Sequence, residues 1–102
     1  MIKITYLENN DQIVYLKSEG HANYDKKGKD IVCSAVSAII VGGLNAIKEI
    51  DDYKISSENG KVEIVLKTDK QNNDDKIVLK TMLIQLKTIE DSYKDYVKIT
   101  KK

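Results

Sequence analysis

The pair Asn59-Gly60 constrains the fold more than any other feature of this sequence. A type I′ hairpin turn needs a positive φ at both of its central positions, and Asn-Gly is the pair that best tolerates this geometry. The pair stands between two strand-like runs, residues 53–57 and 62–67, which carry Tyr, Ile and Val at regular spacing. The sequence therefore predicts an antiparallel β-hairpin centred on this turn.

Hydrophobic periodicity predicts two helices. After Asp30, a good N-cap residue, apolar residues recur at three- and four-residue spacing, and we expect this helix to end near Glu49. The Gly42-Gly43 pair inside it costs about 1–2 kcal/mol relative to alanine, which predicts close packing against a neighbouring element. The second helix follows the polar cluster at residues 72–74. Its apolar face consists of Leu79, Met82, Leu83, Leu86, Ile89 and Tyr93.

A first hairpin over residues 2–16, turning at residues 9–11, and a closing strand at residues 96–99 complete the expected order, ββαββαβ. Because pairs of strands alternate with single helices, the predicted fold class is α+β, a mostly antiparallel sheet with two packed helices. A chain of 102 residues leaves little room for a second core, so residues 1–102 are expected to form a single domain.

Charge and hydropathy argue against several classes of function. The 17 basic residues nearly balance the 16 acidic ones, so no overall field favours a nucleic acid, and we expect no direct nucleic-acid partner. The longest apolar stretch, residues 35–44, falls far short of the roughly 20 residues that span a bilayer. The strand-like N-terminus lacks the features of an export signal. We therefore expect a cytoplasmic protein with no membrane partner.

Cys33 and His21 are the side chains that could carry chemistry, and each is the only one of its kind. A lone Cys near an apolar helix is usually a packing residue, and a lone His is more often structural than catalytic. With Asp30 as N-cap, however, Cys33 lies in the first helical turn, where free N–H groups and the helix dipole favour a thiolate. The sequence leaves open whether the thiol points toward the core or toward the preceding loop. With one Cys and one His, a zinc site would depend on carboxylates that have no recognisable spacing, so we expect no metal and no cofactor.

The spacing of these residues permits a nucleophile and its base to meet. His21 follows the second predicted strand and precedes Cys33 by twelve residues, and the polar loop 22–29 can return to the helix start. Asp30 is a candidate orienting group for the His, a plain helix cap, or both, with one oxygen turned toward His21. The backbone N–H groups around Cys33 are candidate donors to the oxyanion of an acyl-transfer intermediate.

Two segments closely resemble the signature of the bacterial ribosomal-processing cysteine protease family: Gly20-His21-Ala22 and residues 28–38, GKDIVCSAVSA. The order of the remaining elements is also similar to that family along essentially the whole chain. The resemblance implies a homodimeric α+β endopeptidase that acts in ribosome maturation. Its implied substrate is the precursor of large-subunit ribosomal protein number twenty-seven, from which it removes a short N-terminal extension.

By the same resemblance, Cys33 is the nucleophile and His21 the general base. Gly20, Asp30 and Ser37 match positions of the active-site neighbourhood, and the loop at 22–29 resembles one that rearranges when substrate binds. Ser37 follows Cys33 by one helical turn, so it lies on the same face, where it can equally be a small packing residue. The sequence departs from the family at Ser34, where Ala is more frequent, a change that leaves the assignment intact.

Two rival functions use the same residues. In a non-catalytic ribosome-associated module, the signature would form a peptide-docking groove and Cys33 would be a packed thiol. In a thiol redox sensor, Cys33 would need a partner in another molecule, since the chain has no second Cys to resolve an oxidised thiol.

Overall fold

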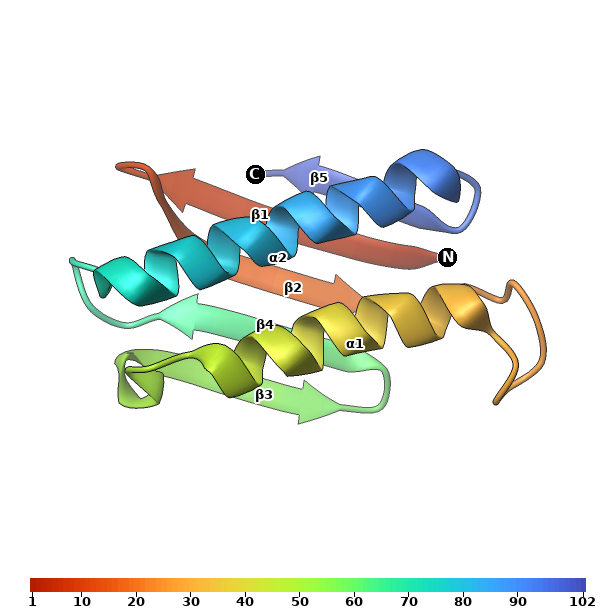
Figure 1. The fold of residues 1–102 in the computed structure, drawn as a ribbon, viewed down its shortest axis with the longest axis horizontal. Helices are drawn as coiled ribbons and strands as arrows, with labels where there is room; N and C mark the ends of the chain where they lie inside the picture. The colour runs from red at the N-terminus through yellow and green to blue at the C-terminus, as the bar shows by residue number, and fades with distance from the viewer.

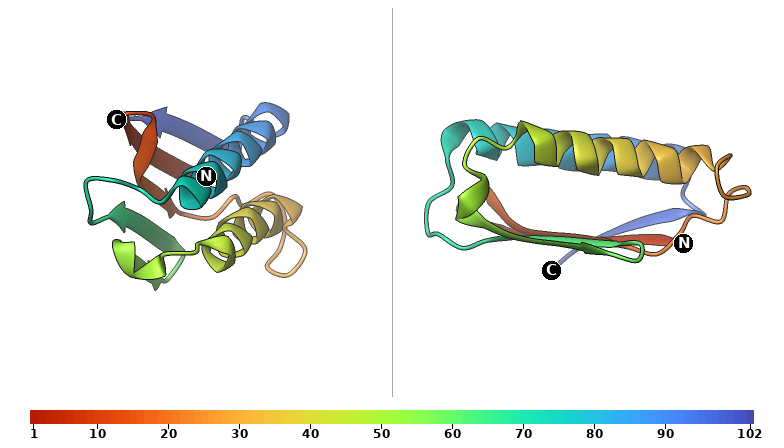
Figure 2. Two further views of the ribbon diagram at one scale, coloured as in Figure 1. Left: turned by 60° about the vertical axis from the view of Figure 1, so that its left-hand side comes forward. Right: turned by 90° about the horizontal axis from the view of Figure 1, so that it is seen from below.

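The computed structural model describes residues 1–102 as one five-stranded sheet whose single covered face carries two helices (Figures 1 and 2). In chain order the elements are β1 (Ile2–Asn9), β2 (Gln12–Glu19), α1 (Ile31–Ala46), β3 (Tyr53–Glu58), β4 (Lys61–Leu66), α2 (Asn73–Ser92) and β5 (Val97–Lys101). A short 3-10 turn, η1 (Ile50–Asp52), precedes β3. The predicted α+β class and the order ββαββαβ are confirmed.

The sheet has the strand order β3-β4-β2-β1-β5. The pairs β1·β2, β2·β4 and β3·β4 are antiparallel, and β1·β5 is parallel. The predicted turn between β3 and β4 is confirmed, because Asn59 has a φ of 40° and Gly60 a φ of 76°. Both central residues of this hairpin therefore adopt the left-handed conformation that type I′ requires.

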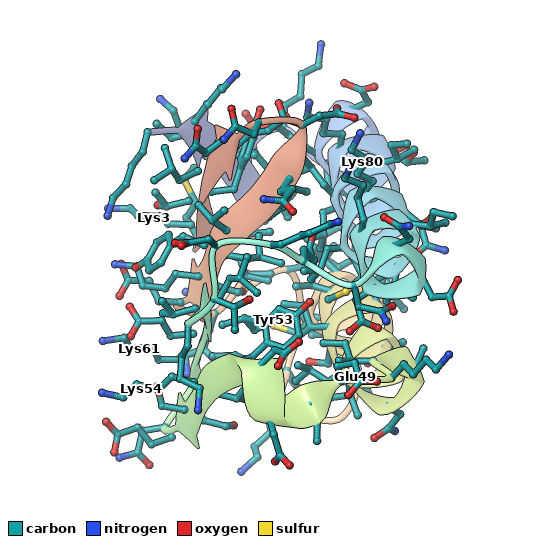
Figure 3. The ribbon with its side chains drawn as sticks, turned by 90° about the vertical axis from the view of Figure 1, so that its left-hand side faces the viewer. Lys3, Glu49, Tyr53, Lys54, Lys61 and Lys80 are labelled. Atoms are coloured by element: carbon teal, nitrogen blue, oxygen red, sulfur yellow. The ribbon has the colours of Figure 1, made fainter.

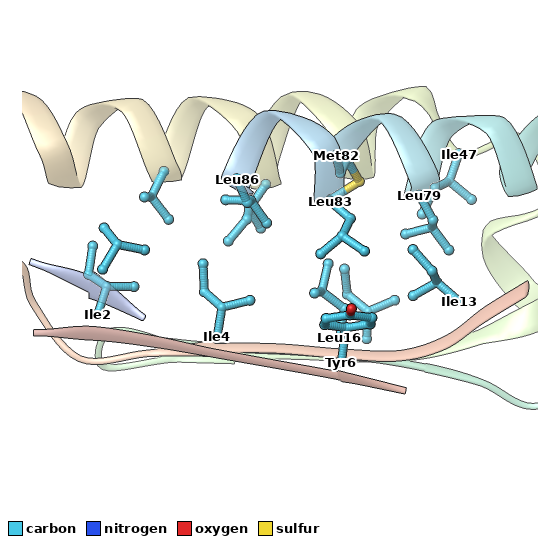
Figure 4. Close-up of a cluster of buried hydrophobic side chains, with 14 of the residues drawn as sticks. Ile2, Ile4, Tyr6, Ile13, Leu16, Ile47, Leu79, Met82, Leu83 and Leu86 are labelled. Carbon is cyan, nitrogen blue, oxygen red and sulfur yellow. The ribbon is translucent and has the colours of Figure 1, made fainter. Parts of the chain in front are cut away.

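The hydrophobic core fills the space between the sheet and the helices (Figure 4). From the sheet, Ile4 and Leu16 point up toward the helices, and from α2 Leu79 and Leu86 point down; all four are at most 2% exposed. The apolar faces predicted for both helices are the faces that they bury here. Because Val32 and Val36 are buried in this core, the start of α1 has a fixed position over the sheet.

Gly43 lets α1 and α2 approach closely. A Cβ atom added to this residue would lie 2.5 Å from Cγ and 2.7 Å from Cε of Met82 on α2. The close packing predicted at the glycine pair is thus confirmed for Gly43, with α2 as the neighbour. Gly42 faces open space, since a Cβ there would meet nothing within 4 Å.

The first helix ends three residues earlier than its hydrophobic pattern indicates. Ile47 already has an extended backbone, with ψ at 126°. The reason is Asp75 on α2, a fully buried carboxylate that accepts hydrogen bonds from the N–H groups of Lys48 (2.7 Å) and Glu49 (3.1 Å). These N–H groups bind a side chain instead of helix carbonyls, so the predicted end near Glu49 is wrong.

The face of the sheet opposite the helices carries exposed side chains. Figure 3 shows Lys3, Lys54 and Lys61 projecting from this face, while Tyr53 points into the space between the two layers. Neither helix combines the length and the apolar character that crossing a membrane would take.

Candidate active site

One end of the molecule brings together segments that lie far apart in the sequence. The N-terminus, the β3–β4 turn, the start of α1 and the end of α2 all lie at this end, on the right of Figure 1. The segment from Gly20 to Asp30, which joins β2 to α1, crosses the same end without helix or strand structure. The two residues that the sequence nominates for chemistry, His21 and Cys33, lie at the two ends of this connection.

Cys33 lies in the first turn of α1 and faces the loop that precedes it. Its Sγ atom accepts a hydrogen bond from the N–H group of Ala22 at 3.3 Å, and its side chain also packs against the edge of the core. The alternative that the sequence left open is thereby resolved, because the sulfur is in contact with the loop as well as partly buried. A hydrogen bond donated to sulfur stabilises negative charge on it, as does the N-terminal end of a helix.

Asp30 caps α1 and also holds the loop. Its Oδ1 atom accepts from the N–H groups of Val32 and Cys33, each at 3.0 Å. Its Oδ2 atom accepts from Tyr24 at 2.9 Å and more weakly from Asp25 at 3.4 Å. The predicted cap is confirmed, but the second oxygen accepts from the loop backbone rather than from His21.

These hydrogen bonds lower the pKa of the Asp30 carboxyl. The bond from the N–H group of Cys33 is the largest cause, and it holds the pKa of the Asp30 carboxyl below its ordinary value even though burial acts in the opposite direction. The carboxylate is therefore ionised at neutral pH. Asp30 thus places a fixed negative charge in the wall of the polar cavity, which His21 also lines.

His21 is held by backbone contacts while its ring remains exposed. Its carbonyl oxygen accepts from the main-chain nitrogen of Met1 at 2.6 Å, and the neighbouring Gly20 donates its N–H group to the carbonyl oxygen of Gly60 at 3.1 Å. A Cβ atom on Gly60 would lie 3.0 Å from the Nε2 atom of His21, so the imidazole packs directly against the β3–β4 turn. No local pattern predicts this contact, because the two residues are almost forty positions apart.

His21 and Cys33 line two cavities together. One has a volume of about 180 Å³ and is largely apolar, with walls formed by Ile2, Ser18, Gly20, Val36, Ser37, Ile40, Val41, Gly60 and Val62. The other, which we call the polar cavity after its residue types, has a volume of about 440 Å³, with walls formed by Asn23, Asp25, Lys27, Gly28, Asp30 and Ser34. A peptide bond placed at the shared wall would thus lie between an apolar and a polar subsite.

The residues predicted for the neighbourhood of the site divide between these cavities. Gly20 and Ser37 both line the apolar cavity, and Asp30 lines the polar one. Gly20 has a φ of 97°, a conformation that favours glycine, and an added Cβ would collide with the carbonyl oxygen of Met1. Only glycine, which has no side chain, therefore fits at the point where β2 ends and the loop to Cys33 begins.

Three N–H groups at the start of α1 already have acceptors within the protein. The N–H groups of Val32 and Cys33 already donate to the Asp30 carboxylate, and that of Ser34 donates to the Asp30 carbonyl oxygen at 3.1 Å. In this arrangement the N–H groups nearest Cys33 donate to Asp30, and the oxyanion hole at the helix start stays a prediction. Nowhere in the chain do three His, Cys, Asp or Glu side chains gather in a way that could hold a metal ion.

Known proteins match this chain over nearly its full length. The family model of the cysteine protease Prp matches residues 1–98. The ribosomal processing cysteine protease Prp of Staphylococcus aureus strain Mu50 is 34% identical over 88 residues, which is 82% of either chain. The protein of the same name from Mycoplasma genitalium is 35% identical over 99 residues, 97% of this chain and 94% of the relative.

Solved structures show the same fold. The crystal structure of an essential ribosomal processing protease Prp from S. aureus, in complex with a covalently linked product peptide, superimposes with a TM-score of 0.89. The two sequences are 30% identical, and the match covers 100% of both chains. A second structure of the S. aureus protein, in complex with a substrate peptide, gives a TM-score of 0.82 at 29% identity.

Proposed function

The chain belongs to the cysteine protease Prp family and is a ribosomal processing cysteine protease, and we propose on that premise that Cys33 and His21 carry its chemistry. The substrate that we propose is the precursor of large-subunit ribosomal protein number twenty-seven. The reaction is hydrolysis of one peptide bond, which removes the N-terminal extension of that precursor. The place of reaction is the cytoplasm, where ribosomal proteins are made and assembled.

In the first half of the reaction, the thiolate of Cys33 attacks the carbonyl carbon of the scissile bond. A C–S bond forms and the carbonyl oxygen becomes an oxyanion. When this intermediate collapses, the C–N bond breaks and the protonated imidazole of His21 donates its proton to the departing amine. The products of this half are a free new N-terminus and a thioester on Cys33.

In the second half, water releases the extension peptide. His21, now neutral, takes a proton from water as the water oxygen attacks the thioester carbonyl carbon. The C–S bond breaks, a carboxylic acid leaves, and the thiolate of Cys33 and the protonated His21 are restored. No cofactor enters either half of this scheme.

The observation that carries this proposal is the shared wall of the two cavities. His21 and Cys33 come from opposite ends of a connecting loop, yet both line the apolar and the polar cavity. The sulfur faces this loop rather than lying wholly within the core. The apolar cavity would accept an apolar side chain next to the scissile bond, and the polar cavity would hold the peptide on the other side.

The remaining site residues act on this pair in our proposal. Asp30 keeps the helix start and the loop together and supplies a negative charge near the imidazolium. Gly20 allows the sharp turn that presents His21. Ser37 lines the apolar cavity one helical turn beyond Cys33, where its small size leaves room for a substrate side chain.

We further propose that the active species is a homodimer. The outer faces of α1 and α2 expose Ile31, Ile77 and Ile84, each at least 54% exposed. Between the two helices runs an apolar groove of about 490 Å³, bounded by Ala38, Ile39, Gly43 and Val78 among others. A second copy covering this face would remove these side chains from water. Sedimentation velocity tests this: a single monomer-sized species at micromolar concentration would contradict it.

The proposed activity is tested with the extended precursor protein. The purified protein and its Cys33→Ala variant are each incubated with the precursor, and the products are weighed by intact-mass spectrometry. We expect one N-terminal cut, made by the unmodified protein alone. A precursor that stays whole while both proteins still bind it would instead establish the peptide-docking module. Reaction of Cys33 only with small oxidants, without binding of the precursor, would favour the redox sensor.

A further inference from the structure

The loop that joins His21 to Cys33 is attached to the body of the protein by one aromatic side chain. The ring of Tyr24 packs edge-on against the ring of Tyr93, with 5.5 Å between centroids and an angle of 85° between planes. It packs in the same manner against Tyr96, at 5.0 Å and 77°. Both geometries fall in the range in which aromatic rings attract one another beyond the effect of burial.

The rest of this loop has no comparable attachment. Residues 23–29 other than Tyr24 are Asn, Asp, Lys or Gly, and all of them are exposed. The side chain of Tyr24 is itself 41% exposed, so it lies on the surface of the protein rather than in its core. Its two ring contacts therefore act together with the backbone hydrogen bonds to Asp30 in holding this segment against the folded body.

The surface that receives Tyr24 is rigid. Tyr93 ends α2 and donates its N–H group to the carbonyl oxygen of Ile89 at 2.9 Å. Tyr96 donates to the carbonyl oxygen of Tyr93 at 2.9 Å, and its own carbonyl oxygen accepts from Ile2 at 2.8 Å. Both rings also pack against the core. This turn is thus fixed to the helix layer and to β1 at once.

Tyr24 is connected to the sulfur of Cys33 through the backbone of residues 22–24. Its own N–H group donates to Asp30 at 2.9 Å, and two residues earlier the N–H group of Ala22 donates to Sγ of Cys33 at 3.3 Å. Ala22 is only 3% exposed, so its backbone has little room to move while the loop stays docked. The N–H groups of Val32 and Cys33 donate to Asp30, and the N–H group of Ala22 is the donor at the sulfur.

We propose that Tyr93 and Tyr96 are positioning residues for the nucleophile. They bind the ring of Tyr24 and so hold the loop where the Ala22 N–H group donates to the sulfur of Cys33. This inference rests on the proposed function, in which that sulfur attacks the substrate. It assigns a role in the reaction to the end of α2, an element that contributes no residue to either cavity beside Cys33.

The test compares Tyr24→Ala with Tyr24→Phe. The first readout is the rate at which iodoacetamide alkylates Cys33, followed by intact mass without any substrate; the second is kcat and KM for the precursor. We expect Tyr24→Ala to slow alkylation and to lower kcat by about three- to tenfold, the size expected when one or two aromatic pairs are lost. Tyr24→Phe keeps the ring and should restore both rates. Lys26→Ala, an exposed change in the same loop, should alter neither.

A double variant shows whether Tyr24 acts through its partner. Tyr96→Leu keeps apolar bulk at the turn but loses the aromatic ring, and it should slow alkylation as Tyr24→Ala does. If Tyr24 and Tyr96 act through their contact with each other, Cys33 is alkylated in the double variant Tyr24→Ala/Tyr96→Leu no more slowly than in the slower single variant. Effects that multiply would show two independent roles and overturn the proposal. The thermal midpoints of all variants are recorded so that partial unfolding is recognised.

Two other results would also overturn the positioning role. One is an unchanged or faster alkylation of Cys33 in Tyr24→Ala; the other is a Tyr24→Phe variant as slow as Tyr24→Ala. Alkylation does not depend on proteolysis, so the two proposals fail separately. A protein that never cuts the precursor refutes the proposed function, while the ratio of alkylation rates among the variants still decides the positioning role.

Discussion

Replacing Gly43 by alanine tests how closely α1 packs against α2. The same helix, α1, carries Cys33. A Cβ atom added at Gly43 would lie 2.5 Å from Cγ and 2.7 Å from Cε of Met82, distances well inside van der Waals contact. Met82 is 2% exposed and packs in the core, so its side chain must leave its present position to admit the new methyl group. Gly42 provides a matched control, because it occupies the same helix and a Cβ there would meet nothing within 4 Å.

The expected magnitudes follow from two opposing effects. Replacing glycine by alanine inside a helix stabilises it by about 1 kcal/mol at either position. Gly42→Ala should therefore raise the free energy of unfolding by about 0.5–1 kcal/mol. At Gly43 the same gain is opposed by overpacking against a buried side chain, which costs about 1–3 kcal/mol. The two variants should differ by about 1–3 kcal/mol, and the helix propensity cancels in this difference.

Urea denaturation at one protein concentration measures this difference, provided that the m-value stays constant. Truncating Met82 to alanine in the Gly43→Ala background should make room for the new methyl group. The double variant is then more stable than the sum of the two single changes predicts. If Gly43→Ala is as stable as Gly42→Ala, the helices do not approach as closely as described, and the reasoning about this contact fails.

Three further predictions concern the site and its surroundings. In Gly60→Ala the new methyl group would lie 3.0 Å from Nε2 of His21, so we expect a lower kcat for precursor cleavage; an unchanged kcat would show that the imidazole does not depend on this turn. The pKa of the Asp30 carboxyl is lowered chiefly by the N–H group of Cys33, so its stabilising effect is present above its ordinary value of 3.8 and is lost as the pH falls through the lower value of the folded state. Thermal melts in acid should therefore show a flatter pH dependence for Asp30→Asn than for the unmodified protein. Burial raises the pKa of Tyr53 to about 12 from 10.0, so its contribution is complete below pH 10 and is lost between pH 10 and about 12; Tyr53→Phe should remove part of this alkaline loss of stability, and equal profiles would contradict the assignment.

The elements that the sequence predicts correctly are those whose cause is local. Asn59-Gly60 specifies its turn through the φ angles that these two residues tolerate, and Asp30 specifies a helix start through an oxygen that reaches the N–H groups two and three residues ahead. The buried faces of both helices follow from spacing alone. Each of these signals lies within a few residues of the structure that it determines.

The elements that the sequence does not predict have causes elsewhere in the chain. The end of α1 is set by Asp75, which accepts from Lys48 and Glu49 across 26 or 27 positions. The contact of Gly60 with His21 depends on the order of strands in the sheet, which brings the β3–β4 turn beside the end of β2. Periodicity and propensity carry no information about either contact, because both are fixed only when the sheet and the helices pack.

The candidate site combines both kinds of cause, and this has a consequence for how its activity is controlled. Asp30 fixes the start of α1, but in doing so it takes up the N–H groups of Val32 and Cys33. The helix therefore offers the sulfur its dipole but not those two donors. The donor that does reach the sulfur comes from Ala22, in a loop that a surface tyrosine holds in place. Changes in the core should then alter the melting temperature more than turnover, whereas changes in the contacts of Tyr24 should alter turnover more than melting, because the loop lies outside the packed core while its backbone touches the reacting atom.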